Sequence, residues 1–158
     1  PGRPLALIAG GIGITPFRSM VKWLLDRGER RDVVLLYGAA AEEDLAFREV
    51  FDEAQRTLGL KAIYVLADAA RVRPGWQGKV GLMDAKLLRE VLPDTARRQC
   101  LVSGPPAMVR AMTAALRSVG VRRTNIRTDF FPGYAPDNPA RGAGAERPII
   151  RRRAFGGV

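Results

Sequence analysis

The sequence predicts an α/β fold: a doubly wound, Rossmann-like parallel sheet of about five strands with helices on both faces. Short apolar runs, rich in leucine and β-branched residues, are typical of strands that are buried on both faces. Stretches of helical length separate these runs, and this alternation favours right-handed crossovers between parallel strands. The expected strands are residues 5–9, 33–37, 62–66, 99–103 and 125–130.

The segments between the strands are amphipathic, as helices that cover a sheet should be. The first begins with Pro16, which fits the first turn of a helix, and the second begins with Asp44, a residue type that caps helices. Residues 71–79 contain two glycines and a proline and predict a long connecting loop. The expected helices are residues 16–26, 44–58, 84–91 and 106–119.

Length and composition indicate one globular domain. The chain has 158 residues, of which 47% are hydrophobic and 27% charged, a balance that excludes disordered and fibrous classes.

The sequence has one cysteine, Cys100, and no histidine, so no metal site is expected. The longest uncharged apolar stretch, residues 5–17, is too short to span a bilayer, and we expect a cytoplasmic protein. The start at Pro1, without a leader, suggests part of a longer polypeptide.

The net charge of +10 raises the possibility of nucleic-acid binding. However, five arginines lie in the last eighteen residues, and no recognised nucleic-acid module accompanies them. We therefore expect one folded domain at residues 1–134 and an arginine- and proline-containing tail at residues 135–158, with no nucleic-acid partner.

The segment IAGGIGITPF follows the first expected strand. Gly10, Gly11 and Gly13 let a ligand approach the backbone, Thr15 can cap the next helix, and Pro16 can start it. A helix N-terminus favours an anion, but the G-x-G-x-x-G fingerprint is only partly met, because Pro16 stands where its last glycine should be. The residues alone leave a phosphate loop and a structural turn equally open.

The segment CLVSGPPAMV, which begins inside the expected strand 99–103, has the same order of features: a strand end, a glycine and a proline before a helix. Ser103 ends a strand, Gly104 permits close approach, and Pro105 leads into a helix. Parallel strands end at one edge of a sheet, so two such loops suit an extended ligand with two ends. Two ordinary strand-to-helix turns remain the alternative.

Five segments in order, GGIGITPF, LLYGAAAEEDLAF, GWQGKVGLM, SGPPAMV and TDFFPGY, resemble the pyridine-nucleotide-binding domain of the ferredoxin–NADP reductase family of flavoproteins. The resemblance implies that the glycine loop lies under the pyrophosphate of NAD(P)H. It places Thr15 and Ser103 beside the nicotinamide, where the hydride is transferred. The remaining residues that it implies in cofactor binding are Gly10, Gly11, Gly13, Pro16, Gly104, Pro105 and Met108.

The resemblance also marks departures from the family pattern. The family commonly has cysteine where Ser103 stands, and Cys100 cannot replace it because an odd offset on a strand points to the other face. Near the end of the domain, the family usually has an acidic residue, one further residue and then an aromatic residue whose ring lies against the flavin. Asp129 and Phe131 match this pattern. Because alternate strand residues face opposite ways, one of Phe130 and Phe131 should pack in the core.

The loop after the third expected strand selects the cofactor in this family. It contains Asp68, which accepts a hydrogen bond from a ribose hydroxyl and repels a 2′-phosphate, so NADH is favoured over NADPH. Arg71 and Arg73 follow closely and could reverse that choice. Asp44 is expected to cap its helix rather than to touch the ligand.

The resemblance therefore implies a domain of an NAD(P)H-dependent flavin oxidoreductase. It positions the nicotinamide for hydride transfer to FAD, and the electrons then pass to a redox partner such as a ferredoxin. The FAD-binding barrel is absent from this chain and belongs to the same or another polypeptide, so the chain alone should bind NADH without turnover. A nucleotide-sensing or partner-docking module of the same fold is the first alternative, and a basic nucleic-acid-binding protein is the second.

Overall fold

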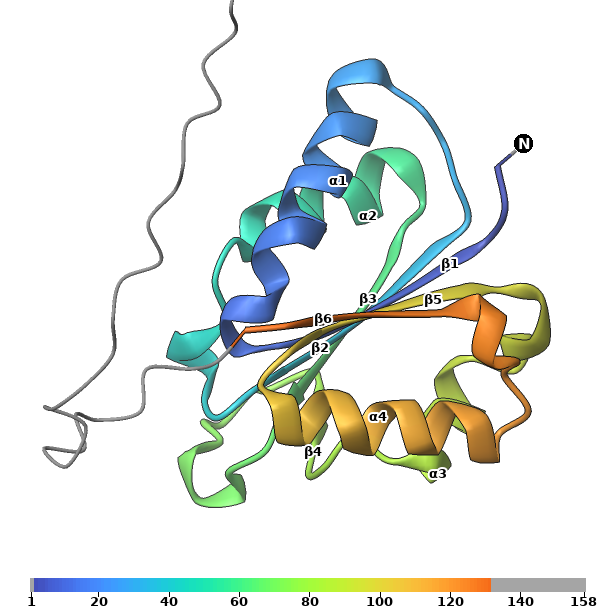
Figure 1. Cartoon of the computed structure of the whole chain (residues 1–158). Helices are drawn as coiled ribbons and strands as arrows, with labels where there is room; N and C mark the ends of the chain where they lie inside the picture. The colour runs from blue at the N-terminus through green and yellow to red at the C-terminus, as the bar shows by residue number, and fades with distance from the viewer. Residues whose placement is uncertain (1, 132–158) are drawn as a thin grey trace, which may run out of the picture.

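A computed structural model describes residues 2–131, and the expected tail, residues 135–158, lies outside this range. The chain forms one parallel sheet in the order β4-β3-β2-β1-β5-β6 (Figure 1). This is the α/β, doubly wound fold that the sequence predicts. The strands are β1 (Leu5–Gly10), β2 (Val33–Ala39), β3 (Lys61–Leu66), β4 (Lys79–Val80), β5 (Gln99–Gly104) and β6 (Ile126–Phe130).

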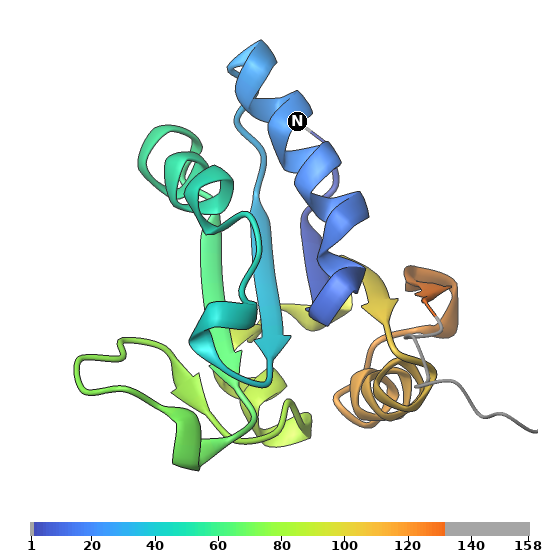
Figure 2. The ribbon, with the colours of Figure 1, turned by 90° about the vertical axis from the view of Figure 1, so that its left-hand side faces the viewer.

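The sheet has six strands rather than about five. The additional strand, β4, begins at Lys79, the last residue of the segment expected to be a loop, and pairs with the end of β3. It has two residues, both exposed, and therefore lacks the apolar run that marks a buried strand. Figure 2 shows β4 and its flanking loops at one end of the sheet and α4 toward the other.

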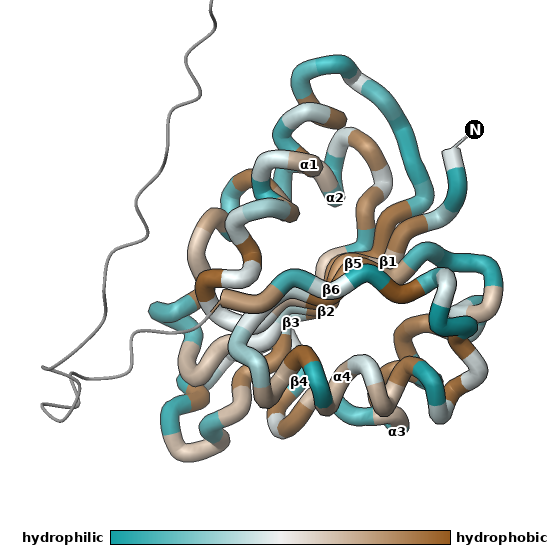
Figure 3. Tube along the Cα trace, viewed as in Figure 1, coloured by the Kyte–Doolittle hydropathy of each residue, from teal (hydrophilic) through white to brown (hydrophobic). Residues whose placement is uncertain are grey.

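Two helices cover each face of the sheet. The helices α1 and α2 lie on one face, and α3 and α4 lie on the other (Figure 1). Side chains along β1 alternate between the two cores, with Leu7 facing α1 and α2 and Ile8 facing α3 and α4. Figure 3 shows the resulting concentration of hydrophobic residues in the central strands. The helices are α1 (Thr15–Arg27), α2 (Arg48–Leu58), α3 (Ala85–Val91) and α4 (Pro106–Ser118).

Two expected helix caps are wrong. Thr15 is already helical, because the 3₁₀ helix η1 (Gly11–Ile14) runs directly into α1, and its Oγ1 donates to the Ile12 carbonyl instead (2.9 Å). Asp44 ends a short 3₁₀ helix, η2 (Glu42–Asp44), and its carboxylate accepts the Ala41 amide (3.1 Å). Helix α2 begins four residues later than Asp44, after Phe47 in a left-handed conformation.

The edge strand β6 corrects a further expectation. Its residues after Ile126 are exposed, Phe130 at 50%, and neither Phe130 nor Phe131 belongs to the two apolar cores. An edge strand whose side chains face solvent does not bury one of two successive aromatic residues. Within residues 2–131, no helix has the length and apolar character needed to cross a membrane.

The direction of the chain across the sheet reverses at β1. This strand has β2 on one side and β5 on the other, with Ala9 opposite Tyr37 and Ser103. In open parallel sheets, ligands bind beyond the carboxyl ends of the strands at such a switch point. The glycine loop after β1 and the Gly-Pro-Pro segment after β5 therefore meet at the expected edge.

Candidate functional site

A cavity of about 510 Å³ opens at the carboxyl edge of the sheet, on the side of α3 and α4. Its walls are mainly apolar side chains and glycine backbone, together with one carboxylate, Asp44. Four residues that the sequence assigns to ligand binding line it: Gly10, Gly11, Pro105 and Met108. The two loops singled out from the sequence thus meet at one cavity.

Two glycines of the loop after β1 have different structural roles: one faces open space and the other packs against backbone. Gly11 has a φ of +52°, and a Cβ there would meet no atom within 4 Å, so the residue leaves room in the cavity that it lines. Gly13 is buried, and a Cβ there would lie 2.2 Å from the Ser103 carbonyl oxygen. The absent side chain of Gly13 therefore lets η1 pack on the backbone of β5, and its expected contact with a ligand stays a prediction.

The start of α1 lies next to this loop. No side chain among the described residues caps η1 or α1, and the first turn of α1 contains no acidic residue. The Thr15 amide donates to the Ile12 carbonyl and Pro16 has no N–H, so the amide groups that favour an anion are those at the start of η1, which continues into α1. Thr15 and Pro16 form this first turn but do not line the cavity.

The end of β5 carries an unusual polar group. Ser103 is fully buried, and its Oγ has no hydrogen-bond partner among the described residues. Buried hydroxyls are rarely left unpaired, so this one is available to a further group. Ser103 and Gly104 do not line the cavity, but the Gly104 carbonyl accepts the Phe131 amide (3.0 Å) and holds Phe131 at the same edge.

Cys100 lies on the opposite face of β5 from its neighbour Leu101 and packs with α4 in the second core. Burial raises the pKa of its thiol to about 11.

We expect iodoacetamide at pH 8 to leave Cys100 of the native chain unlabelled, because the thiolate is the reactive form and the sulfur is inaccessible. Intact-mass spectrometry measures this, with the urea-unfolded chain as the labelled control. Rapid labelling of the native chain would contradict this placement of Cys100.

Sequence reasoning missed most of the cavity wall. The residues after β2 and β3 have a recognisable signal, since they follow the carboxyl ends of parallel strands. Those after β4 end the segment GWQGKVGLM, which contributes to the family resemblance, but no role in ligand binding is assigned to them from the sequence. The missed lining residues are Gly38, Ala39, Ala40, Asp44, Val65, Ala67, Gly81, Leu82, Met83, Ala111 and Met112.

The loop after β3 contributes Ala67 to this wall, and its charged residues lie beside the wall without lining it. Asp68 is exposed and caps the 3₁₀ helix η3 (Ala69–Arg71), where its Oδ1 accepts the Ala70 amide (3.0 Å). Arg71 Nη2 lies 2.6 Å from Glu43 Oε1, and Arg73 Nη2 lies 3.8 Å from Glu43 Oε2. Hydrogen bonds from the backbone of Glu43 and from the Arg71 guanidinium lower the pKa of the Glu43 carboxyl.

The cavity, the helix start and the charged loop form a continuous edge with three different chemistries. The apolar wall suits a planar ring, the uncapped helix start suits an anionic group, and the charged loop suits hydroxyl groups or a second anion. A nucleotide with a pyrophosphate has these parts in one molecule.

Comparisons with known proteins agree with this arrangement. A family model described as the oxidoreductase NAD-binding domain matches residues 7–114. NADH-cytochrome b5 reductase 1 of Dictyostelium discoideum is 30% identical over 129 residues, which cover 80% of this chain and 44% of that protein. NADH nitrate reductase of Cucurbita maxima is 35% identical over 111 residues, which cover 68% of this chain and 12% of that protein. The chain thus spans less than half the length of these relatives.

Solved structures share the fold. The FAD/NAD-binding domain of a nitric oxide dioxygenase from Vibrio cholerae superposes with a TM-score of 0.73 at 20% identity, covering 84% of this chain and 52% of that one. A cytochrome P450 reductase from Amycolatopsis gives a TM-score of 0.70 at 27% identity, covering 82% and 38%.

Proposed function

Because this chain belongs to the oxidoreductase NAD-binding domain family, we propose that it binds NADH in preference to NADPH and presents the nicotinamide to FAD. The FAD belongs to a flavin-binding domain of the same or another polypeptide. The observation that carries this proposal is the cavity at the switch point, which joins the glycine loop after β1 to the Gly-Pro-Pro segment after β5. Cytochrome b5 reductases and NADH nitrate reductases among the relatives support the choice of NADH.

The residues present fit a dinucleotide. Gly10 and Gly11 expose backbone to the cavity, so a pyrophosphate can approach without meeting a Cβ. The uncapped start of η1, which follows Gly10 directly, supplies amide donors for its charge. On the other side, Pro105 and Met108 form an apolar wall against which a planar ring can lie.

The chain's contribution is to bind and orient. NADH supplies the hydride and FAD accepts it, so no side chain here has to titrate near neutral pH. We assign Thr15 and Ser103 to the two sides of the nicotinamide. Neither lines the cavity, and the buried Ser103 Oγ, which has no partner within residues 2–131, is the polar group that supports this assignment. Phe131, held by Gly104, lies against the flavin. Apolar walls exclude water from the reacting rings.

The electrons then leave the flavin for a redox partner, which we propose to be a separate protein or domain. Relatives named NADH-cytochrome b5 reductase and glycine betaine monooxygenase reductase subunit support an acceptor of this kind. A ferredoxin-like acceptor fits the same scheme. The chain by itself reduces no acceptor in this proposal, because the flavin domain is required.

We expect the 158-residue chain to bind both NADH and ADP-ribose in calorimetric titration. Ala111 is exposed on α4 and lines the cavity, so Ala111→Phe fills the cavity without disturbing the core. This variant should weaken ADP-ribose binding about tenfold or more, equivalent to about 1.4 kcal/mol.

The matched control is Ala114→Phe, an exposed position of the same helix that does not line the cavity. It should leave the dissociation constant within about twofold. Absence of binding by the unmodified chain, or equal weakening by both variants, would remove the basis for placing the nucleotide in this cavity.

A further inference from the structure

We infer that Glu43 is a specificity-determining residue: it holds Arg71 and Arg73 away from a 2′-phosphate and thereby favours NADH over NADPH. This inference rests on the proposed function. It locates the selection in an ion-pair cluster that joins two loops, in addition to the single acid Asp68 that the sequence suggests.

The cluster connects the loop after β2 with the loop after β3. Arg71 Nη2 lies 2.6 Å from Glu43 Oε1, and Arg71 Nη1 lies 3.7 Å from Asp44 Oδ2. Arg73 Nη2 lies 3.8 Å from the other oxygen of Glu43. Both carboxylate oxygens of Glu43 therefore face an arginine, and each arginine already has an acidic partner.

The two loops are held side by side where the cluster forms. The Ala67 amide donates to the Ala39 carbonyl (2.9 Å), and the Asp68 amide donates to the Ala40 carbonyl (3.2 Å). Ala40, Asp44 and Ala67 line the cavity. The Arg71 guanidinium, next to the Asp44 carboxylate, thus lies at the rim of the cavity rather than at a remote surface.

The charges at this rim decide which cofactor is accepted. A 2′-phosphate carries up to two negative charges and binds best to arginines that present free donors. Here such a phosphate has to displace Glu43 from Arg71 and Arg73, and then remain close to the carboxylates of Glu43 and Asp44. A ribose hydroxyl has no charge, so it does not have to displace Glu43 and is not repelled by the two carboxylates.

These ion pairs are exposed, with about half of each Glu43 and Arg71 side chain accessible to solvent. Exposed pairs contribute little to folding, so one substitution can release the arginines without unfolding the domain. Glu43→Gln keeps the size of the side chain and removes its charge. Arg71 and Arg73 then become available to a phosphate at the rim.

The experiment measures the affinities of the 158-residue chain for ADP-ribose and for 2′-phospho-ADP-ribose by calorimetry. We expect Glu43→Gln to shift the ratio of the two dissociation constants about tenfold toward the phosphorylated ligand. Adding Arg71→Ala to Glu43→Gln should reverse most of that shift, because the released arginine carries it. The affinity of the single variant for ADP-ribose itself should change less than about twofold.

The matched control is Glu42→Gln, which makes the same change in net charge at the preceding residue. Glu42 pairs with Arg48 (2.7 Å) and does not line the cavity. An unchanged ratio in Glu43→Gln, or an equal shift in Glu42→Gln, would overturn the inference while ADP-ribose binding left the proposed function intact. If the unmodified chain binds neither ligand, the proposed function fails and this inference with it.

Discussion

Replacing Gly13 with alanine is expected to lower the free energy of unfolding by about 3 kcal/mol. The new Cβ would lie 2.2 Å from the Ser103 carbonyl oxygen and 2.6 Å from the Gly104 amide nitrogen. Both are backbone atoms of β5 at the centre of the sheet, so neither can move aside as a flexible side chain would. Either η1 lifts off β5 or the sheet distorts.

Urea unfolding followed by circular dichroism measures this effect, with Gly11→Ala as the control. Gly11 has a positive φ, and a Cβ there meets open space, so alanine costs only about 1 kcal/mol of backbone strain. The comparison separates steric overlap from backbone conformation within one loop. An equal loss of stability in the two variants would contradict the close packing of Gly13 on β5.

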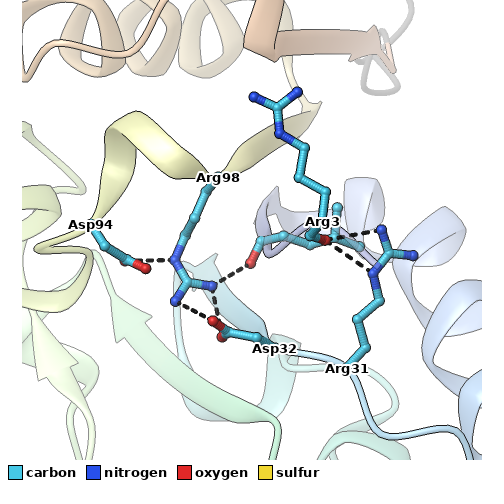
Figure 4. A network of polar contacts seen from close by, with 6 residues as sticks. Arg3, Arg31, Asp32, Asp94 and Arg98 are labelled. Atoms are coloured by element: carbon cyan, nitrogen blue, oxygen red, sulfur yellow. Dashed lines mark hydrogen bonds and ion pairs between the residues drawn. The ribbon is translucent and has the colours of Figure 1, made fainter. Parts of the chain in front are cut away.

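Replacing Arg98 with methionine is expected to lower the free energy of unfolding by about 2 kcal/mol. Figure 4 shows its guanidinium between the carboxylates of Asp32 and Asp94. Arg98 directly precedes β5, so this cluster lies at the amino end of the sheet, opposite the edge that carries the cavity. Arg98 binds Asp32 through two hydrogen bonds (2.8 and 3.0 Å), Asp94 through one (2.7 Å) and the Leu5 carbonyl through another (3.1 Å). It thereby ties the start of β1 to the segments before β2 and β5.

The size of this effect follows from the exposure of the partners. The Arg98 side chain is only 8% exposed, whereas Asp32 is 54% and Asp94 38% exposed. Water can therefore solvate both carboxylates once the arginine is gone, and the loss stays below that of a fully buried pair. Arg27→Met is the control: Arg27 is 61% exposed, and its loss should change stability by less than about 0.5 kcal/mol.

The loss of stability in Arg98→Met is expected to depend on pH. The hydrogen bond from Arg98 lowers the pKa of the Asp94 carboxyl below its ordinary value of 3.8. This group stabilises the fold fully above that ordinary value, and the contribution is lost as the pH falls through the lowered pKa of the folded state. The stability difference between the wild type and Arg98→Met should therefore be constant near neutral pH and shrink below about pH 4. A difference that stayed unchanged at pH 2 would contradict the pairing.

Local pattern accounts for most of the fold. The apolar runs that form β1, β2, β3 and β5 are recognisable in the sequence because a strand buried on both faces is apolar throughout. The sequence predicts that the second helix begins at Asp44, but α2 begins at Arg48. Asp44 is a residue type that caps helices, yet its carboxylate accepts the Ala41 amide within the separate 3₁₀ turn η2. Strand β4 was missed because its pairing with β3 depends on backbone position and not on apolar side chains.

The same reasoning identifies only a minority of the residues that line the candidate site. Gly10, Gly11, Pro105 and Met108 were found, since they follow strand ends with glycine and proline signals. The wall formed by Gly81, Leu82 and Met83 was not found. These residues end the segment GWQGKVGLM, which contributes to the family resemblance, but their place in the wall depends on where the chain turns after β4.

The sequence by itself determined the alternation of strands and helices and the two glycine- and proline-containing loops at one sheet edge, because these depend on neighbours along the chain. Only the tertiary structure decided that Gly13 serves packing while Gly11 opens to the cavity, since the difference lies in the approach of β5. It likewise decided that Arg71 faces Glu43, 28 residues away, and that Arg98 faces Asp32, 66 residues away. Such pairs form where distant segments cross, and a charge in a sequence does not reveal its partner until the chain has folded.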